Sequence, residues 1–308
     1  MSNATHIPLK GSHTSRILTI ATHAFTQLAR MKVFYFLAIF AVIAIGSNFF
    51  ELPQHQGPEA VGAHVLTSIK SWSLGAMTLF SVVLSIVATA LLLPKDVEDR
   101  TLYTILAKPV PRIDYLAGKL LGVLLLVFVS LALMDLLMTA VLQIRTSMIL
   151  DQQMEMAKGM GWPADAIASL REETLAQGPN ASLQGAVFAV FLRSSIMASL
   201  ALLISTFSSS TLFTTIVSFL IYFIGHFQAD ARDVYLQAGQ AGESLFTRIA
   251  SLLFSMVLPD FQLFNVIDAV IEGQTMPLLT LAKLTAVGLY YALFFTIASW
   301  FIFSDKEF

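Results

Sequence analysis

The chain has 308 residues, a length that would accommodate two soluble domains. Its composition excludes that reading, because 56% of the residues are hydrophobic and only 12% are charged, about half the usual charged fraction of a soluble domain. We therefore expect an integral membrane protein. The absence of cysteine excludes disulfides and thiolate metal sites, and a net charge of −2 gives no indication of a nucleic-acid partner.

Six apolar segments approach the roughly 20 residues that a helix needs to cross a bilayer. These segments are residues 33–50, 70–93, 115–142, 185–206, 211–228 and 279–303. The sequence therefore predicts an all-α membrane protein, a single transmembrane domain over residues 1–308 with six transmembrane helices. More than half of the Lys and Arg residues then fall on the side of the N-terminus, which predicts that both termini are cytoplasmic.

Residues 16–31, directly before the first predicted span, form an amphipathic pattern. The apolar face carries Ile17, Ile20, Ala21, Ala24, Leu28 and Met31, and the polar face carries Thr19, Thr22, His23, Thr26 and Arg30. A helix of this kind beside a span is typical of one lying in the membrane interface. A plain cytoplasmic helix is the alternative.

Three longer segments connect the spans. Residues 94–112 are polar and charged, with Pro109 and Pro111 near their end. The outer segment 143–184 is long enough for two helices, the second starting at Pro163 and stopping at Gly178-Pro179. The outer segment 229–278 contains a short apolar piece, Leu245 to Leu258, whose length suits a re-entrant or interfacial helix.

Motifs for a nucleotide or metal site are missing from the sequence. The Gly118-Lys119 pair is followed by Leu120, where a Walker A loop needs Ser or Thr, so we expect no nucleotide site, no cofactor and no enzymatic activity in this chain. The six histidines have no partner four residues away, so we expect no metal site.

Four methionines lie close together in the outer segment, and thioethers select Cu(I). They are Met148, Met154, Met156 and Met160. We favour the alternative that they are flexible apolar contacts of an outer helix.

Two features inside the spans concern packing. Gly118 and Gly122, four residues apart, predict a close helix–helix seam within the protomer. Asp135 and Arg193 are the ionisable residues most deeply placed in the spans, at matched depths on sequential helices. Since charged groups in a bilayer face the bundle interior and find a partner, these two residues predict an ion pair, with a role in a substrate path as the alternative.

The stretch Leu93–Arg112, continuing to Gly118-Lys119, resembles the cytoplasmic segment after the second span of type-2 ABC exporter permeases. The matching residues are Glu98, Thr101, Leu102, Leu106, Pro109, Val110, Arg112, Gly118 and Lys119. Arg100 departs from the pattern, because a glycine often stands at that position. The segment from Leu258 through Asn265 and the charged C-terminal tail are similar as well. The chain looks closest to permeases of copper-enzyme maturation, including those that serve nitrous oxide reductase assembly.

This resemblance implies the transmembrane permease subunit of an ABC transporter in a bacterial inner membrane. Its partners would be a separate ABC ATPase carrying ATP and Mg²⁺, and a second copy of this permease or a related one. ATP hydrolysis by the ATPase would drive export or extraction of a substrate. The ATPase contact would be a coupling segment over 94–112, with a short helix from about Lys95 to Lys108. Its residues are Asp96, Glu98, Asp99, Arg100, Thr101, Ile105, Leu106, Lys108, Pro109 and Arg112.

Within this coupling segment we expect three different roles. Asp96, Asp99 and Arg100 would present a charged face to the ATPase. Ile105 and Leu106 would dock apolar side chains, either at the ATPase or back against the bundle. Glu98 with Arg112 would form an internal ion pair. A solvated loop is the alternative for the whole segment. If the contact lies elsewhere, Ser208–Ser210, between the fourth and fifth spans, is the next candidate.

Two other functions stay open at this point. A secondary transporter driven by an ion gradient would normally show inverted repeats and broken spans with central acidic residues, a pattern that only Asp135 approaches. A scaffold or mechanotransmitter that passes ATPase work to a periplasmic partner fits the long outer segments.

Overall fold

The computed structural model describes residues 12–46, 58–98, 110–208, 210–228 and 258–305. These residues form helices and no strand. The helices are α1 (His13–Ala29), α2 (Lys32–Gly46), α3 (Pro58–Glu98), α5 (Arg112–Gly159), α6 (Ala164–Ala176), α7 (Ala181–Phe207), α8 (Thr211–His226), α11 (Ile267–Ile271) and α12 (Leu278–Asp305), with a 3₁₀ turn, η3 (Gln262–Phe264).

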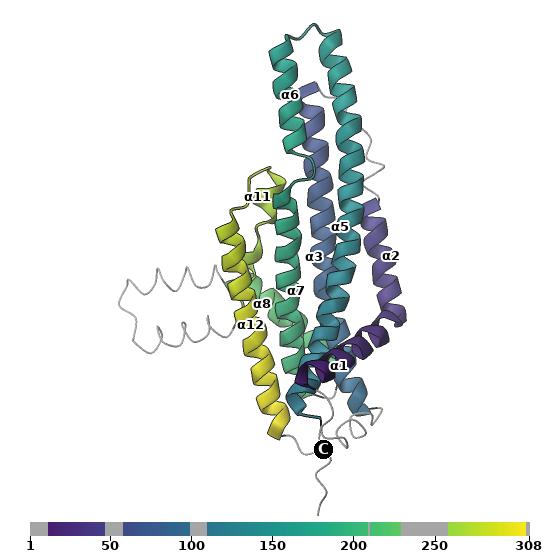
Figure 1. Ribbon diagram of the computed structural model, residues 1–308, viewed down its shortest axis with the longest axis vertical. Coiled ribbons are helices and arrows are strands. Elements are labelled where there is room, and N and C mark those ends of the chain that lie inside the picture. Colours follow the sequence, from purple (N-terminus) through teal and green to yellow (C-terminus); the bar gives the residue numbers. More distant parts are fainter. Residues whose placement is uncertain (1–11, 47–57, 99–109, 209, 229–257, 306–308) are drawn as a thin grey trace, which may run out of the picture.

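The long helices α3, α5, α7 and α12 run along the long axis of the molecule (Figure 1). At one end α1 lies across the bundle, and at the other α5 and α6 form a protruding hairpin, so we call these the α1 end and the hairpin end. Helix α7 is the central element, because it packs on α3, α5, α8 and α12. In the most apolar 18-residue window of the α6–α7 stretch, 78% of the residues are buried, whereas in the corresponding window of α12 only 28% are buried.

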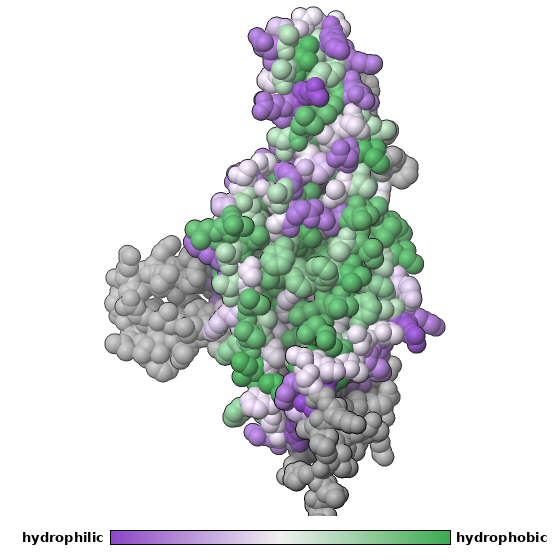
Figure 2. Space-filling view, viewed as in Figure 1, coloured by the Kyte–Doolittle hydropathy of each residue, from purple (hydrophilic) through white to green (hydrophobic). Residues whose placement is uncertain are grey.

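Four stretches are long and apolar enough to cross a membrane, and they lie in α3, α5, the α6–α7 stretch and α12. Figure 2 shows apolar side chains around the middle of the visible face and hydrophilic ones concentrated on the hairpin. The all-α fold is therefore confirmed for the described residues, and the four long apolar helices are compatible with a membrane protein. Helices α2 and α8, which correspond to two further predicted spans, have only 15 and 16 residues.

Two helices extend well beyond the predicted spans. Helix α3 begins at Pro58 rather than near residue 70, and α5 continues past residue 142 to Gly159. Hydropathy detects only the apolar part of a helix, and α5 can extend beyond that part because no Pro or Gly interrupts it between 123 and 158. The outer segment 143–184 thus holds the end of α5 and the whole of α6, which starts after Pro163 and ends before Gly178, as predicted.

The seam predicted at Gly118 and Gly122 is the place where α1 crosses α5. A Cβ on Gly118 would lie 2.7 Å from the Cβ of Ile20, and one on Gly122 would lie 2.6 Å from the Cβ of Ala24 and 2.8 Å from the carbonyl oxygen of Ala21. The apolar face of α1 therefore packs on α5, since only glycine lets the two backbones approach this closely. This prediction is confirmed.

We expect Gly122→Ala to lower the free energy of unfolding by about 1–3 kcal/mol, because the new methyl group would overlap backbone as well as side-chain atoms of α1. The measurement is thermal or denaturant unfolding of the purified chain in lipid nanodiscs. The matched control is Gly75→Ala in α3, where an added Cβ meets nothing within 4 Å. Equal stability of the two variants would show that α1 does not pack on this seam.

Candidate functional site

Chemistry-bearing side chains gather at the α1 end, around the first two turns of α5. Arg112, Asp114, Tyr115 and Lys119 project from these turns to three other helices, and we call these residues with their partners the α5 junction. The helix starts after Pro111, whose extended backbone (φ −57°, ψ 135°) directs the chain into the first turn. The junction directly follows residues 99–109 of the predicted coupling segment, which lie outside the described residues.

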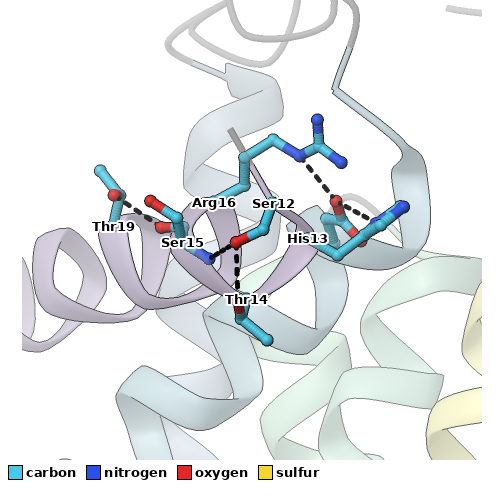
Figure 3. Close-up of polar contacts among 7 residues, drawn as sticks. Ser12, His13, Thr14, Ser15, Arg16 and Thr19 are labelled. Atoms are coloured by element: carbon cyan, nitrogen blue, oxygen red, sulfur yellow. Dashed lines mark hydrogen bonds and ion pairs between the residues drawn. The ribbon is translucent and has the colours of Figure 1, made fainter. Parts of the chain in front are cut away.

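Asp114 fastens α1 to α5. Its buried carboxylate is 3.0 Å from Arg16 Nε and 3.0 Å from His13 Nδ1. Figure 3 shows the side chains of His13 and Arg16, from the first turn of α1, pointing toward the same carboxyl group. Asp114 also lies in the first turn of α5, where the helix dipole stabilises a negative charge. An acid with two basic neighbours thus ties the start of α1 to the start of α5.

Asp96 and Lys119 form a buried ion pair between α3 and α5. Lys119 Nζ lies 2.7 Å from Asp96 Oδ2, and the Tyr115 hydroxyl donates to the same oxygen at 2.5 Å. The two charged side chains are only 4% and 8% exposed. Lys119 also lies over the Tyr115 ring, 5.7 Å from its centroid. Because water hardly reaches this pair, each charge depends on the other.

Arg112 binds the end of α12. Its Nη1 donates to the carbonyl oxygens of Phe303 at 2.7 Å and Ser304 at 2.6 Å. These carbonyls belong to the last turn of α12, where helix geometry leaves acceptors without intrahelical partners and concentrates negative partial charge. The Phe303 ring stacks on Tyr115, with centroids 6.1 Å apart, and lies under the Arg112 guanidinium. A cation from α5 thus caps α12.

The spacing of side chains along the start of α5 explains why this short stretch contacts three other helices. Asp114, Gly118 and Gly122 are four residues apart and so share the face that meets α1, while Tyr115 and Lys119 share the neighbouring face that meets α3. A displacement applied to the start of α5 would consequently move α1, α3 and α12 together.

The structure corrects the predicted coupling helix at its beginning. Lys95–Glu98 are not the start of a separate helix, because α3 continues through the buried Pro94 to Glu98. Asp96 does not face outward as predicted; it is buried against Lys119 and Tyr115, since a carboxylate at this position gains a lysine within 2.7 Å. The remaining residues of that prediction lie outside the described residues, namely Asp99, Arg100, Thr101, Ile105, Leu106, Lys108 and Pro109.

The predicted bracing pair of Glu98 and Arg112 stays untested. The Glu98 side chain is outside the described residues, and the contacts of Arg112 include the two α12 carbonyls and the Phe303 ring. Ser208 and Ser210, the next candidates, are the C-cap of α7 and the N-cap of α8. The Ser210 hydroxyl accepts the amide of Phe213, so it has a capping role in the turn.

The predicted ion pair of Asp135 and Arg193 is wrong. Asp135 accepts a hydrogen bond from Gln184 Nε2 at 3.1 Å, near the start of α7, whereas Arg193 Nη2 donates to the carbonyl oxygen of Phe261 at 3.1 Å. Neither residue belongs to an ion pair among the described residues. The expected matched depth does not hold, because Asp135 lies level with Gln184, which precedes Arg193 by nine residues, or about 13.5 Å, along α7.

Arg193 instead fixes the segment Leu258–Phe264. Besides the Phe261 carbonyl, the guanidinium interacts with the Tyr222 side chain of α8. The Phe261 amide donates to the Gly225 carbonyl at 3.1 Å, and a Cβ on Gly225 would lie only 2.6 Å from the Phe261 ring. This segment, part of which entered the family resemblance, is therefore wedged between α7 and α8.

At the hairpin end, a buried lysine connects α3 to the α6–α7 turn. Lys70 is 1% exposed, and its Nζ donates to Gln177 Oε1 at 2.6 Å. Sequence reasoning missed Lys70, and it missed the roles of His13, Arg16 and Asp114. The spacing of Asp114, Gly118 and Gly122 was a signal for the α1 contact, whereas Lys70 had none, because its partner lies over 100 positions away.

The hairpin carries an open groove of about 410 Å³ between α5 and α6. It is lined by Met154, Ala164, Ile167, Ala168, Arg171, Glu172 and Leu175. Of the four outer methionines, Met148 and Met160 are exposed on α5 and Met154 contacts this groove. The described residues contain no group of three His, Asp or Glu side chains that could hold a metal ion.

No protein-family model and no curated protein sequence matches this chain.

Proposed function

We propose that this protein is the transmembrane permease subunit of an ATP-binding-cassette transporter. A separate ATPase would supply the energy by hydrolysing ATP with Mg²⁺, and the chain would export or extract a substrate. The proposal includes six spans, with α2 and α8 completing the set, an α1 helix at the membrane interface, both termini in the cytoplasm of a bacterium, and assembly with a second permease copy.

The observation that carries this proposal is the α5 junction. A permease without a nucleotide site needs a place where an external push reaches several spans at once. The first two turns of α5, where the coupling segment ends, are tied to α1 by Asp114, to α3 by Lys119 and to α12 by Arg112. Force on residues 99–109 would therefore move four helices as one body, which supports a role in coupling.

A second candidate function is transmission of ATPase work to a periplasmic partner. Helix α5 is continuous for 48 residues, about 72 Å at 1.5 Å per residue, from the junction to the hairpin. Such a rod would carry motion from one side of the membrane to the groove between α5 and α6. The continuity of α5 favours this candidate over a secondary transporter.

The first test is biochemical assembly. We expect the purified chain to show no ATP hydrolysis alone and to co-purify, in a two-plus-two complex, with an ABC ATPase expressed from its own genome. Saturable hydrolysis by the chain, free of contaminants, or failure to recruit any such ATPase would refute the proposed function.

Within such a complex, Arg100→Glu should weaken ATPase binding or lower coupled hydrolysis, because like charges brought together at an interface cost several kcal/mol. Folding should hardly change, since surface substitutions usually stay within about 0.5 kcal/mol. The matched control is Lys158→Glu, an exposed position in the last turn of α5 at the hairpin end. Equal coupling in both variants would place the ATPase contact elsewhere.

A further inference from the structure

We propose that Arg193 is a binding site for an oxyanion, a carboxylate or phosphate group, which its Nε and Nη2 hydrogens would hold side-on. This inference rests on the proposed function, because it gives the class of the substrate as an anionic molecule. It concerns this chain by itself, so it can be tested without the ATPase.

The position of Arg193 is unusual for a cation. It lies in the middle of α7, the most enclosed of the candidate spans, and is only 5% exposed. A charged side chain at this depth is costly and normally pairs with an opposite charge. Among the described residues the ion pairs all lie at the α1 end, and Arg193 belongs to none of them. Its charge is therefore uncompensated in this part of the chain.

The hydrogen bonds of the guanidinium show which edge a ligand would use. Nε and Nη2 donate in parallel on one side of the planar group, which matches two oxygens of a carboxylate or phosphate. In the structure Nη2 donates to the Phe261 carbonyl at 3.1 Å, while Nε has no acceptor among the described residues. A single carbonyl oxygen thus occupies half of an edge that a two-oxygen anion would fill.

The neighbouring acid does not fill this edge. Asp260 is buried, but its Oδ1 accepts the amide of Gln262 at 3.0 Å within its own turn. The phenol of Tyr222 also interacts with the guanidinium, and the ring of His226 packs against Tyr222 and Phe261. An oxyanion would offer two negatively charged acceptors to the Nε and Nη2 donors, whereas the Phe261 carbonyl offers one neutral acceptor, so an oxyanion would displace this carbonyl.

Displacement of this carbonyl has a structural consequence. Phe261 is tied to α8 through its amide, which donates to the Gly225 carbonyl at 3.1 Å, and Gln262 Nε2 donates to the His226 carbonyl at 2.7 Å. If the peptide of Phe261 turns away from Arg193, these bonds to the end of α8 loosen. Anion binding would therefore be detected as weaker hydrogen bonding of the segment Leu258–Phe264.

The experiment measures amide hydrogen exchange of the full chain in phosphatidylcholine nanodiscs. One arm adds phosphatidylglycerol to the bilayer, and the other adds inorganic phosphate or acetate to the buffer. We expect faster exchange at Phe261 and Gln262 in at least one arm. The lipid arm would identify a lipid headgroup and the buffer arm a soluble anion. Unchanged exchange in both arms would overturn the proposal.

Stability gives a second readout. An anion at about ten times its Kd should reduce the unfolding equilibrium constant about eleven-fold if it binds only the folded chain. Arg193→Gln should abolish this effect, and Arg193→Lys should weaken it about tenfold or more, because lysine keeps the charge but lacks the two-donor edge. Arg30→Gln, at the C-cap of α1, is the control for loss of an exposed arginine.

A purely structural Arg193 would give a different result. Arg193→Gln would then lower stability by the same factor with and without the anion, which would refute the binding site. If Arg193→Gln fails to fold, the exchange measurement on the unaltered chain and the stability of the Arg193→Lys variant still distinguish a binding site from a purely structural arginine. Because no ATPase is present, a negative result here is distinguishable from failure of the permease assembly.

Discussion

Replacing Asp96 by alanine is expected to lower the free energy of unfolding by about 3–5 kcal/mol. The change leaves Lys119, which is 3% exposed, as a buried cation without its carboxylate, and it removes the acceptor of the Tyr115 hydroxyl. Breaking one side of a buried pair is costly because the remaining charge cannot recover its hydration. Unfolding in nanodiscs, followed by loss of helical signal, measures the effect.

A double-mutant cycle separates the pair from its parts. Asp96→Ala with Lys119→Met should be less destabilised than Asp96→Ala alone, since no unpaired charge is left and methionine fills much of the volume of lysine. Asp165→Ala, in the exposed first turn of α6, controls for loss of an acid and should change little. A double variant as unstable as the sum of the single variants would show that Asp96 and Lys119 do not interact.

Leu136→Pro should lower the free energy of unfolding by about 3 kcal/mol or more. Proline removes the backbone hydrogen bond to the carbonyl four residues earlier and clashes with it, in the middle of α5. The kink would also separate the motion of the junction from that of the hairpin. Spin-label distances between the two ends of α5, together with the unfolding temperature, measure both effects.

Leu136→Ala is the matched control, because Leu136 is 70% exposed and its side chain contributes little to the protein core. Any large effect of proline must then come from the backbone. If Leu136→Pro keeps the unfolding temperature and the distance distribution of the unaltered chain, α5 does not act as a rigid rod, and the transmission candidate fails.

The sequence alone determined the membrane class, the all-α fold and the approximate place of the long helices. These follow from local properties. A helix that crosses a bilayer needs a run of consecutive apolar residues, and such a run can be recognised in the sequence without knowledge of its partners. The α6 boundaries and the glycine seam were predictable for the same reason. Pro163 and Gly178 end helices locally, and Gly118 with Gly122 leave one helix face without side chains whatever the partner is.

Only the tertiary structure decided which charged groups meet. Asp96 sits in a charged stretch that suggested an exposed face, yet Lys119 lies across the bundle within 2.7 Å of it. Asp135 lies level with Gln184 rather than with Arg193, nine residues further along α7, and Arg112 contacts the carbonyls of α12 almost two hundred positions away. Hydropathy and spacing fix where a residue lies along its own helix. The rotation of each helix about its axis, which selects the partner, is set by packing against all its neighbours at once.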